Sequence, residues 1–91
     1  MKVKVNPAAG FKRVLGNEVD VELGAQASVS ELLDALCSRH RDMRSMAFCS
    51  TGLRDDVNIL VNGRNIDSLQ GLATGLSDGD KVVIFPAAIG G

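Results

Sequence analysis

The residues of this chain with the most distinctive chemistry are the two glycines that close it, Gly90 and Gly91. A carboxylate at neutral pH is a poor acyl donor, so MgATP must first convert it to an acyl-adenylate in a narrow, water-poor enzyme channel. Because glycine has no Cβ, its backbone and acyl carbon can approach an enzyme wall and a nucleophile closely. In such a reaction this chain would be the substrate, and its adenylate would accept either sulfur or, through a cysteine, a lysine amine.

A chance origin of the glycine pair is the alternative. At average glycine usage, two glycines in succession close roughly 0.5% of chains. The pair gains weight from its position, because it comes shortly after Phe85-Pro86, which closes a strongly apolar segment. We therefore predict a domain over residues 1–85 and a flexible tail over residues 86–91 that projects from it.

The other candidate side chains favour structural roles. Cys37 and Cys49 have neither the spacing of a metal site nor that of a redox pair. We expect a small core residue at 37 and a loop thiol at 49, because a reducing compartment disfavours a disulfide between them. His40 suits capping or packing better than catalysis, and Asp55-Asp56 suits a solvated loop better than a metal site. The sequence thus predicts no catalytic residue, no metal and no stably bound cofactor in this chain.

Composition bounds the class of protein. A chain of 91 residues forms one domain, and its formal charge of −1 gives no field that would attract nucleic acid or an anionic membrane. The absence of Tyr and Trp removes the usual stacking platforms for single-stranded nucleic acid. The N-terminus alternates in polarity instead of forming a signal peptide, and no apolar run approaches the ~20 residues of a membrane span. We expect a cytoplasmic protein.

The first half of the chain predicts two strands and a helix. Residues 2–6 and 18–23 alternate apolar with charged or polar side chains, as half-buried strands do, and residues 7–17 read as a loop between them. Ser28 and Glu31 form a capping box at the start of a helix. The apolar residues that follow fall on one face of that helix: Val29, Leu32, Leu33, Leu36 and Cys37.

The second half predicts further strands. Residues 57–61 form a strand, Asn62-Gly63 is a strong hairpin signal, and residues 64–66 make a short return strand. A compact connector over 68–76, with a short helical turn, leads through a turn at 77–80 to the last strand. That strand, Lys81–Phe85, is apolar on both faces, which is typical of a central position in a sheet.

The order of elements predicts the fold class. Strand, strand, helix, strand, short strand and strand, joined by a right-handed crossover, indicate an α+β domain. A mixed sheet of four to five strands with one main helix across it and the terminal strand in the middle is the β-grasp architecture. Residues 42–56 fit this order least clearly; we expect Met43, Met46 and Phe48 to supply packing and Thr51-Gly52 to form a turn.

The chain resembles the ubiquitin-like sulfur-carrier family. This family includes the small subunit of molybdopterin synthase, the thiamine sulfur carrier and the archaeal small ubiquitin-like modifier proteins. The resemblance is strongest over residues 57–91. The segments that carry it are Val61-Asn62-Gly63-Arg64-Asn65-Ile66, Leu69-Gln70-Gly71-Leu72, Ser77-Asp78-Gly79-Asp80-Lys81-Val82, Ile84-Phe85-Pro86 and Gly90-Gly91.

The resemblance implies a function for the tail. A ubiquitin-activating-type enzyme would use MgATP to adenylate Gly91, with Gly90 as its required neighbour. The product would be a thiocarboxylate that delivers sulfur, for example to molybdopterin or to transfer RNA, or an isopeptide bond to a target lysine. The implied partners are that activating enzyme, the large subunit of molybdopterin synthase and target-protein lysines. The tail departs from the usual pattern at Ala87, where a second proline is common, and at Ile89, where a small residue is common.

Apolar residues on the strands suggest how a partner docks. Leu60, with Val83 or Phe85, can face away from the helix and form a surface patch near the tail. We predict these three residues, with Pro86 and Ile89, as contacts for the activating enzyme or a synthase subunit. The alternative is that residues 42–56 or the 68–76 connector cover them. A rival function is a non-covalent β-grasp interaction module with an incidental Gly-Gly end.

Overall fold

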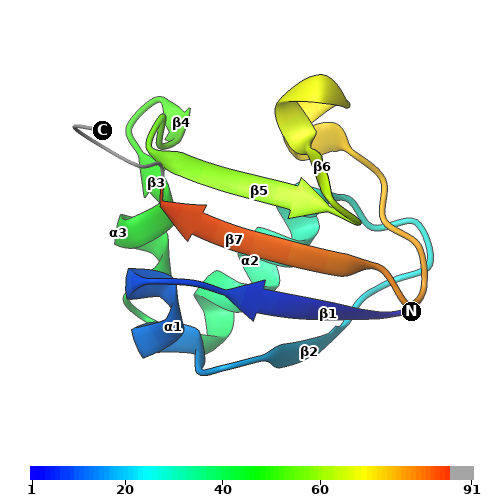
Figure 1. The fold of residues 1–91 in the computed structure, drawn as a ribbon, viewed down its shortest axis with the longest axis horizontal. Coiled ribbons are helices and arrows are strands. Elements are labelled where there is room, and N and C mark those ends of the chain that lie inside the picture. Colours follow the sequence, from blue (N-terminus) through cyan, green and yellow to red (C-terminus); the bar gives the residue numbers. More distant parts are fainter. Residues whose placement is uncertain (87–91) are drawn as a thin grey trace.

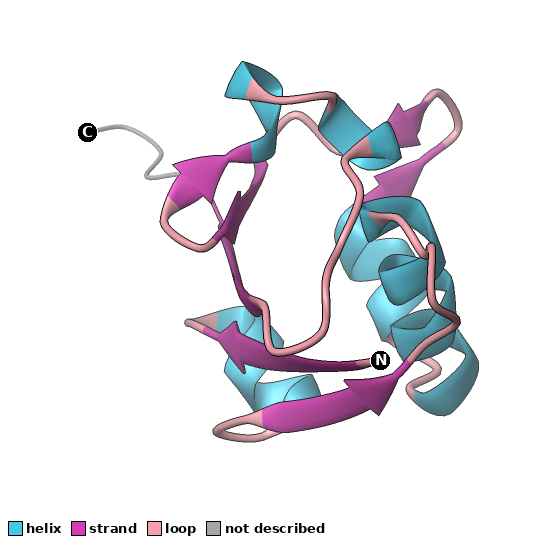
Figure 2. Ribbon diagram, turned by 90° about the vertical axis from the view of Figure 1, so that its right-hand side faces the viewer, coloured by secondary structure: helices cyan, strands magenta, loops and turns pink. Residues whose placement is uncertain are grey.

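A mixed sheet crossed by one long helix makes up most of the computed structural model, which describes residues 1–86 (Figure 1). The strands lie in the order β2-β1-β7-β5-β6. Their bounds are β1 Lys2–Pro7, β2 Val19–Glu22, β5 Val57–Val61, β6 Arg64–Asn65 and β7 Lys81–Pro86. The α+β, β-grasp prediction is confirmed, and Figure 2 shows α2 (Val29–Arg39) on one side of the curved sheet.

The last strand lies in the middle of the sheet, as its apolar sequence predicts. β7 runs parallel to β1 and antiparallel to β5, so both of its edges are paired. Val82 and Ile84 are buried against the helix, while the residues that alternate with them lie on the opposite face. A strand held on both edges is a rigid base for whatever follows it in the chain.

The long helix begins where the capping box places it. The Ser28 hydroxyl accepts a hydrogen bond from the Glu31 amide at 3.4 Å, which satisfies one free N–H of the first turn. The predicted apolar stripe packs on the sheet, and its members from Val29 to Leu36 are at most 1% exposed. Cys37 is half-buried, and the helix ends at Arg39 with the His40 amide bonded to the Leu36 carbonyl at 2.9 Å.

The predicted hairpin between β5 and β6 also forms. Asn62 and Gly63 have φ of 51° and 86°, the pair of positive values that a tight type I′ turn requires. The Asn62 side chain reaches from this turn to the start of β7, where its oxygen accepts from the Lys81 amide at 3.0 Å. The connector that follows contains two short 3₁₀ turns, η1 Ile66–Ser68 and η2 Gly71–Ala73.

Two segments differ from the sequence prediction. Residues 7–17 contain a short helix, α1 Gly10–Leu15, where we expected only a loop. Phe11 and Leu15 lie one turn apart on it and are both buried, so tertiary packing stabilises a helix that six residues could not maintain alone. Gly16 does not interrupt this helix; it caps the C-terminal end with φ of 89°.

The second difference lies in residues 42–56. They form α3 Met43–Ala47 and a small hairpin of β3 Phe48–Cys49 and β4 Gly52–Leu53. Met43 and Ala47, one turn apart, are fully buried, which anchors α3 to the core. Figure 1 shows α1, α3 and this hairpin gathered at the end of the sheet toward which β7 points. Among residues 1–86, no helix is both long and apolar enough to span a membrane.

Candidate functional site

The candidate site is the end of the molecule where β7 finishes and the chain continues toward Gly91. Pro86 lies in register with Val57 of β5, and the Ala8 amide donates to the Ile84 carbonyl at 3.0 Å. The last residues of β7 are therefore held by neighbours on both sides. Pro86 belongs to β7, whereas our predicted tail began at that residue. The predicted site residues Ile89, Gly90 and Gly91 lie outside the described part of the chain.

The sheet surface away from α2 carries the predicted apolar patch. Val83 and Phe85 alternate with the buried Val82 and Ile84, so they lie on the opposite face, and Leu60 is directly across from Val83. We call Leu60, Val83 and Phe85 the sheet-face patch. All three are half-buried, so no described segment covers them completely.

Polar residues border the sheet-face patch. Asn6 of β1 is in register with Val83, and Asn58 of β5 is in register with Phe85. Asn58 also accepts a hydrogen bond from the Asn65 side chain at 3.4 Å. Lys81 precedes Val83 on the same face of β7, so the rim contains a cation as well as these amides. An apolar centre with a polar rim is the usual composition of a surface that binds and releases a partner.

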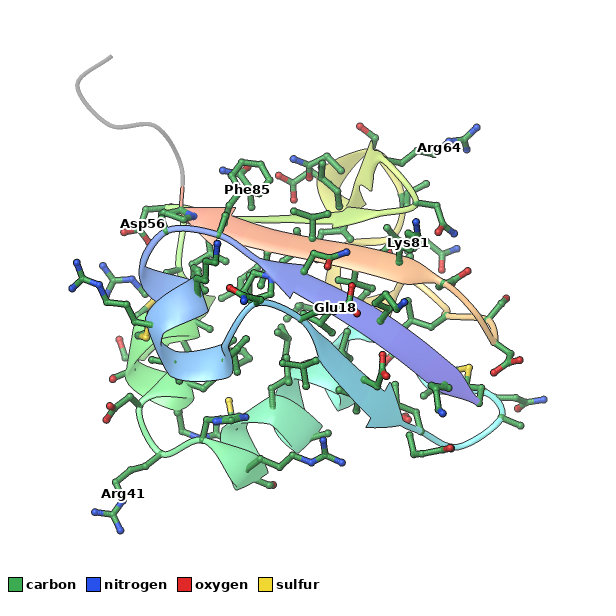
Figure 3. The ribbon with its side chains drawn as sticks, turned by 60° about the horizontal axis from the view of Figure 1, so that its bottom comes forward. Glu18, Arg41, Asp56, Arg64, Lys81 and Phe85 are labelled. Carbon is green, nitrogen blue, oxygen red and sulfur yellow. The ribbon has the colours of Figure 1, made fainter. Side chains whose placement is uncertain are left out.

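A second surface lies at the same end of the sheet, on the helix side. It is a shallow hollow of about 270 Å³, which we call the tail-root hollow. Its walls come from α1, α3, the segment before β5 and the last residue of β7. The residues that line it are Gly10, Phe11, Ser45, Met46, Arg54, Asp56, Val57 and Pro86. Figure 3 shows Asp56 and Phe85 at the same end of β7, with Lys81 at the other end.

An ion pair forms one side of the tail-root hollow. Arg54 donates from Nε to Asp56 Oδ1 at 3.0 Å and from Nη2 to Asp56 Oδ2 at 3.1 Å. This bidentate hydrogen bonding lowers the pKa of Asp56 and raises the pKa of Arg54. Both side chains are partly exposed, at 45% for Arg54 and 34% for Asp56, so the pair is screened by solvent and serves to orient the guanidinium.

The other candidate side chains are not brought together. Burial raises the pKa of the Cys37 thiol, whereas a hydrogen bond from Thr51 lowers that of the exposed Cys49 thiol. Cys37 is half-buried at the edge of the core, where we expected a core residue, and Cys49 lies in β3, where we expected a loop. His40 is the C-terminal cap of α2, and Asp55 is exposed beside the Arg54–Asp56 pair. Residues 1–86 contain no group of three or more side chains that could hold a metal ion.

Sequence reasoning missed the tail-root hollow. Its residues come from four separate stretches of chain, and two of them, α1 and α3, were not predicted as helices. One signal was available, because Phe11/Leu15 and Met43/Ala47 are apolar pairs at the spacing of one helical turn. That signal does not say that the two helices meet beside Pro86, which only the topology determines.

The sequence and the fold both match known proteins. The ThiS family profile matches residues 8–91. Small archaeal modifier protein 3 of Haloferax volcanii is 30% identical over 92 residues, with 100% of both chains covered. The sulfur carrier protein CysO of Mycobacterium tuberculosis is 40% identical over 78 residues, covering 75% of this chain and 84% of the relative.

Solved structures give the same result for the fold. The crystal structure of SAMP1 from Haloferax volcanii superposes with a TM-score of 0.86 at 30% identity and covers 100% of both chains. A chain in the crystal structure of the Amycolatopsis orientalis BexX/CysO complex superposes with a TM-score of 0.80 at 30% identity, covering 98% of this chain and 99% of that one. The similarity thus extends over the sheet, the helix and the end of the molecule that carries the tail.

Proposed function

This chain belongs to the ThiS family of ubiquitin-like sulfur carriers, and on that premise we propose that it acts through the carboxylate of Gly91, as a sulfur carrier, a protein modifier or both. The observation that carries the proposal is the family match, which continues past Pro86 through Gly90-Gly91. It is supported by the fold, in which β7 brings the chain out of the sheet beside the sheet-face patch.

The proposed reaction begins on an activating enzyme. An oxygen of the Gly91 carboxylate attacks the α-phosphorus of ATP, and pyrophosphate leaves. Hydrosulfide then displaces AMP to give a thiocarboxylate, or the thiolate of an enzyme cysteine displaces AMP to give a thioester. In the second case a target lysine amine attacks the thioester, which forms an isopeptide bond and releases the cysteine thiol. Mg²⁺ and ATP are bound by the enzyme, so this chain holds no cofactor.

In this scheme the domain contributes recognition. The paired edges of β7 hold Pro86 in place, which limits where Gly90 and Gly91 can go and so reduces the entropy lost when they enter a channel. We propose that the sheet-face patch, together with Pro86 and Ile89, docks the activating enzyme. A synthase subunit is a second candidate for the same surface. A relative, CysO of Amycolatopsis orientalis, has been crystallised in complex with BexX, which supports the binding of a partner by this fold.

A sulfur carrier and a protein modifier differ in the product formed at Gly91, which is a thiocarboxylate for the carrier and an isopeptide bond for the modifier. We propose both because named relatives of each kind match this chain, a sulfur carrier and a small archaeal modifier. A cytoplasmic location, where MgATP is available, is part of the proposal. The rival candidate remains a non-covalent β-grasp module whose last two glycines are incidental.

Intact mass spectrometry of the protein from its native cells tests the proposal. A carrier shows the mass increase that results from replacing one oxygen by sulfur, at the C-terminus. A modifier shows high-mass conjugates that leave a Gly-Gly remnant on target lysines after digestion. If neither species is present in cells that contain the protein, the non-covalent interpretation replaces the proposal.

A further inference from the structure

We infer that the tail-root hollow is a second docking surface for the enzyme that activates Gly91, and that it receives an apolar side chain from the rim of that enzyme's channel. The inference rests on the proposed function of Gly91. It adds a contact on the helix side of the sheet to the proposed contact on the opposite face. The partner is defined by its chemistry: an apolar group with a hydrogen-bond acceptor beside it.

The chain after Pro86 is short. Residues 87–91 can span at most about 18 Å when fully extended. An enzyme that encloses Gly91 together with MgATP must therefore bring the rim of its channel close to Pro86. Because Pro86 is itself part of the wall of the tail-root hollow, the rim meets the hollow.

The wall of the tail-root hollow is largely apolar. Phe11, Met46, Val57 and Pro86 give it an apolar surface. Phe11 is 3% exposed and fixed by the core, whereas Met46 is only half-buried. A methionine side chain is flexible and polarizable, so it adapts to the shape of an inserted group. Burying an apolar side chain here removes apolar surface from water on both partners.

The polar side of the hollow can bind a hydrogen-bond acceptor. Two of the N–H groups of Arg54 are bonded to Asp56, which fixes the plane of the guanidinium. An arginine carries five N–H donors, so about three stay available to an acceptor on the enzyme. Arg54 also lines the two neighbouring hollows, so this side chain stands where the surface depressions of this end of the domain meet.

The two proposed docking surfaces lie on opposite faces of the sheet. Val83 and Phe85 point to one face, and the alternating residues that end with Pro86 point to the other. An enzyme that contacts both holds the end of β7 from two sides, which fixes the direction in which residues 87–91 leave. Substitutions in the hollow should therefore weaken binding without changing the chemistry at Gly91.

The test uses the full-length protein with the ubiquitin-activating-type enzyme of its own cell, in an ATP–pyrophosphate exchange assay that gives kcat and KM for this chain. Ser45→Phe fills the hollow from an exposed position on α3, and Ser38→Phe on the exposed face of α2 is its matched control. We expect Ser45→Phe to raise KM about tenfold or more with kcat unchanged, while Ser38→Phe leaves both unchanged.

A charge exchange tests the polar side. Arg54→Glu with Asp56→Lys reverses the ion pair and keeps the net charge. Arg64→Glu with Asp67→Lys is the control, because it exchanges two exposed charges near the Asn62-Gly63 turn, away from Pro86, and also keeps the net charge. We expect the exchange at 54 and 56 to raise KM by about three- to tenfold and the control exchange to leave it unchanged. Thermal unfolding of each variant checks that the fold is retained.

The outcomes separate this inference from the proposed function. If the wild-type chain supports exchange but both hollow variants have KM values within twofold of it, the hollow is not a docking surface and the proposed function stands. If the wild-type chain supports no exchange, or a chain lacking Gly90-Gly91 supports it equally, the proposed function fails and the inference fails with it.

Discussion

The two ends of β7 differ in what holds them, and the difference indicates what each end is for. At the Lys81 end, side chains of Asn62, Asp78 and Asp80 bond to backbone and to one another at 2.7–3.0 Å. At the Pro86 end, Phe85 of the sheet-face patch is half-buried on one face, and the tail-root hollow opens on the other with an apolar wall beside the Arg54–Asp56 pair. One end has its polar groups satisfied within the molecule, whereas the other offers apolar surface that a partner can bury.

The two ends of β7 therefore have different roles. The Lys81 end fixes the register of β7 against β1 and β5, since Asp78 accepts from the Lys2 amide and Asn62 bonds to both Asp80 and Lys81. The Pro86 end keeps its surface for binding. Mutations at the first end should therefore change stability, and mutations at the second should change reactivity with the partner enzyme.

Removing Gly90-Gly91 should give the largest effect. We expect complete loss of ATP–pyrophosphate exchange, because the carboxylate that reacts is displaced and its new neighbours carry side chains. The midpoint of thermal unfolding should stay within the error of the wild-type value, since the deletion leaves every residue of β7 and of the buried core in place. Retained exchange would contradict the proposed role of Gly91.

Substitutions in the sheet-face patch come next. Leu60→Ser with Phe85→Ser should raise KM for this chain in the exchange assay by about tenfold to a hundredfold. The reason is that the double variant removes the apolar centre of the proposed docking surface and leaves its amide rim. Ser68→Ala changes an exposed residue of the connector outside the patch, so it serves as a control and should leave KM unchanged. A well-folded double variant with unchanged adenylation would rule out docking through this face.

At the opposite end of β7, Asp80→Ala should act on stability alone. Asp80 accepts from the Asn62 side chain at 2.9 Å and from the Ser77 amide at 2.8 Å, so its loss should lower the free energy of unfolding by about 1–3 kcal/mol. Chemical denaturation measures that change. In the absence of denaturant, where the variant is folded, its kcat and KM for adenylation should equal the wild-type values. A change in KM as large as that of the patch variant would remove the distinction between the two ends.

The smallest effect is expected from the Arg54–Asp56 pair. The lowered pKa of Asp56 means that the charged form of this side chain stabilises the fold. The stabilisation is fully present above the usual carboxyl pKa. It is lost as the pH falls through the lowered pKa of Asp56 in the folded protein. Asp56→Asn should therefore be slightly less stable than wild type near neutral pH. The difference should vanish in acid, when denaturation curves are compared across pH. A difference that grows as pH falls would contradict this sign.

The sequence was sufficient for the parts of the fold that have a clear period. Alternation located β1 and β2, the apolar segment before Asn62-Gly63 located β5, the apolar run located β7 at the centre, and the capping box located the start of α2. Each of these signals is local and repeats over several residues. The Asn62-Gly63 turn was predictable for a similar reason, because few residues tolerate two successive positive φ angles.

The elements at the tail end were not predictable in the same way. α1 is one and a half turns long, begins at Gly10 and is followed by Gly16, so its sequence indicates a loop. β3 and β4 have two residues each, which is too short for a pattern. These elements form because Phe11, Met43 and Ala47 are buried by contacts from distant parts of the chain. The candidate site therefore lies where local sequence signals are weakest.

Trapping with hydroxylamine tests the central claim most directly. Hydroxylamine attacks acyl-adenylates and thioesters, so incubating the chain with the activating enzyme, MgATP and hydroxylamine should convert the Gly91 carboxylate to a hydroxamate. Fragment mass spectra would locate the modified residue. Our account predicts an ATP-dependent hydroxamate at Gly91; a hydroxamate on an Asp or Glu side chain, or none in a chain that binds the enzyme, would contradict it.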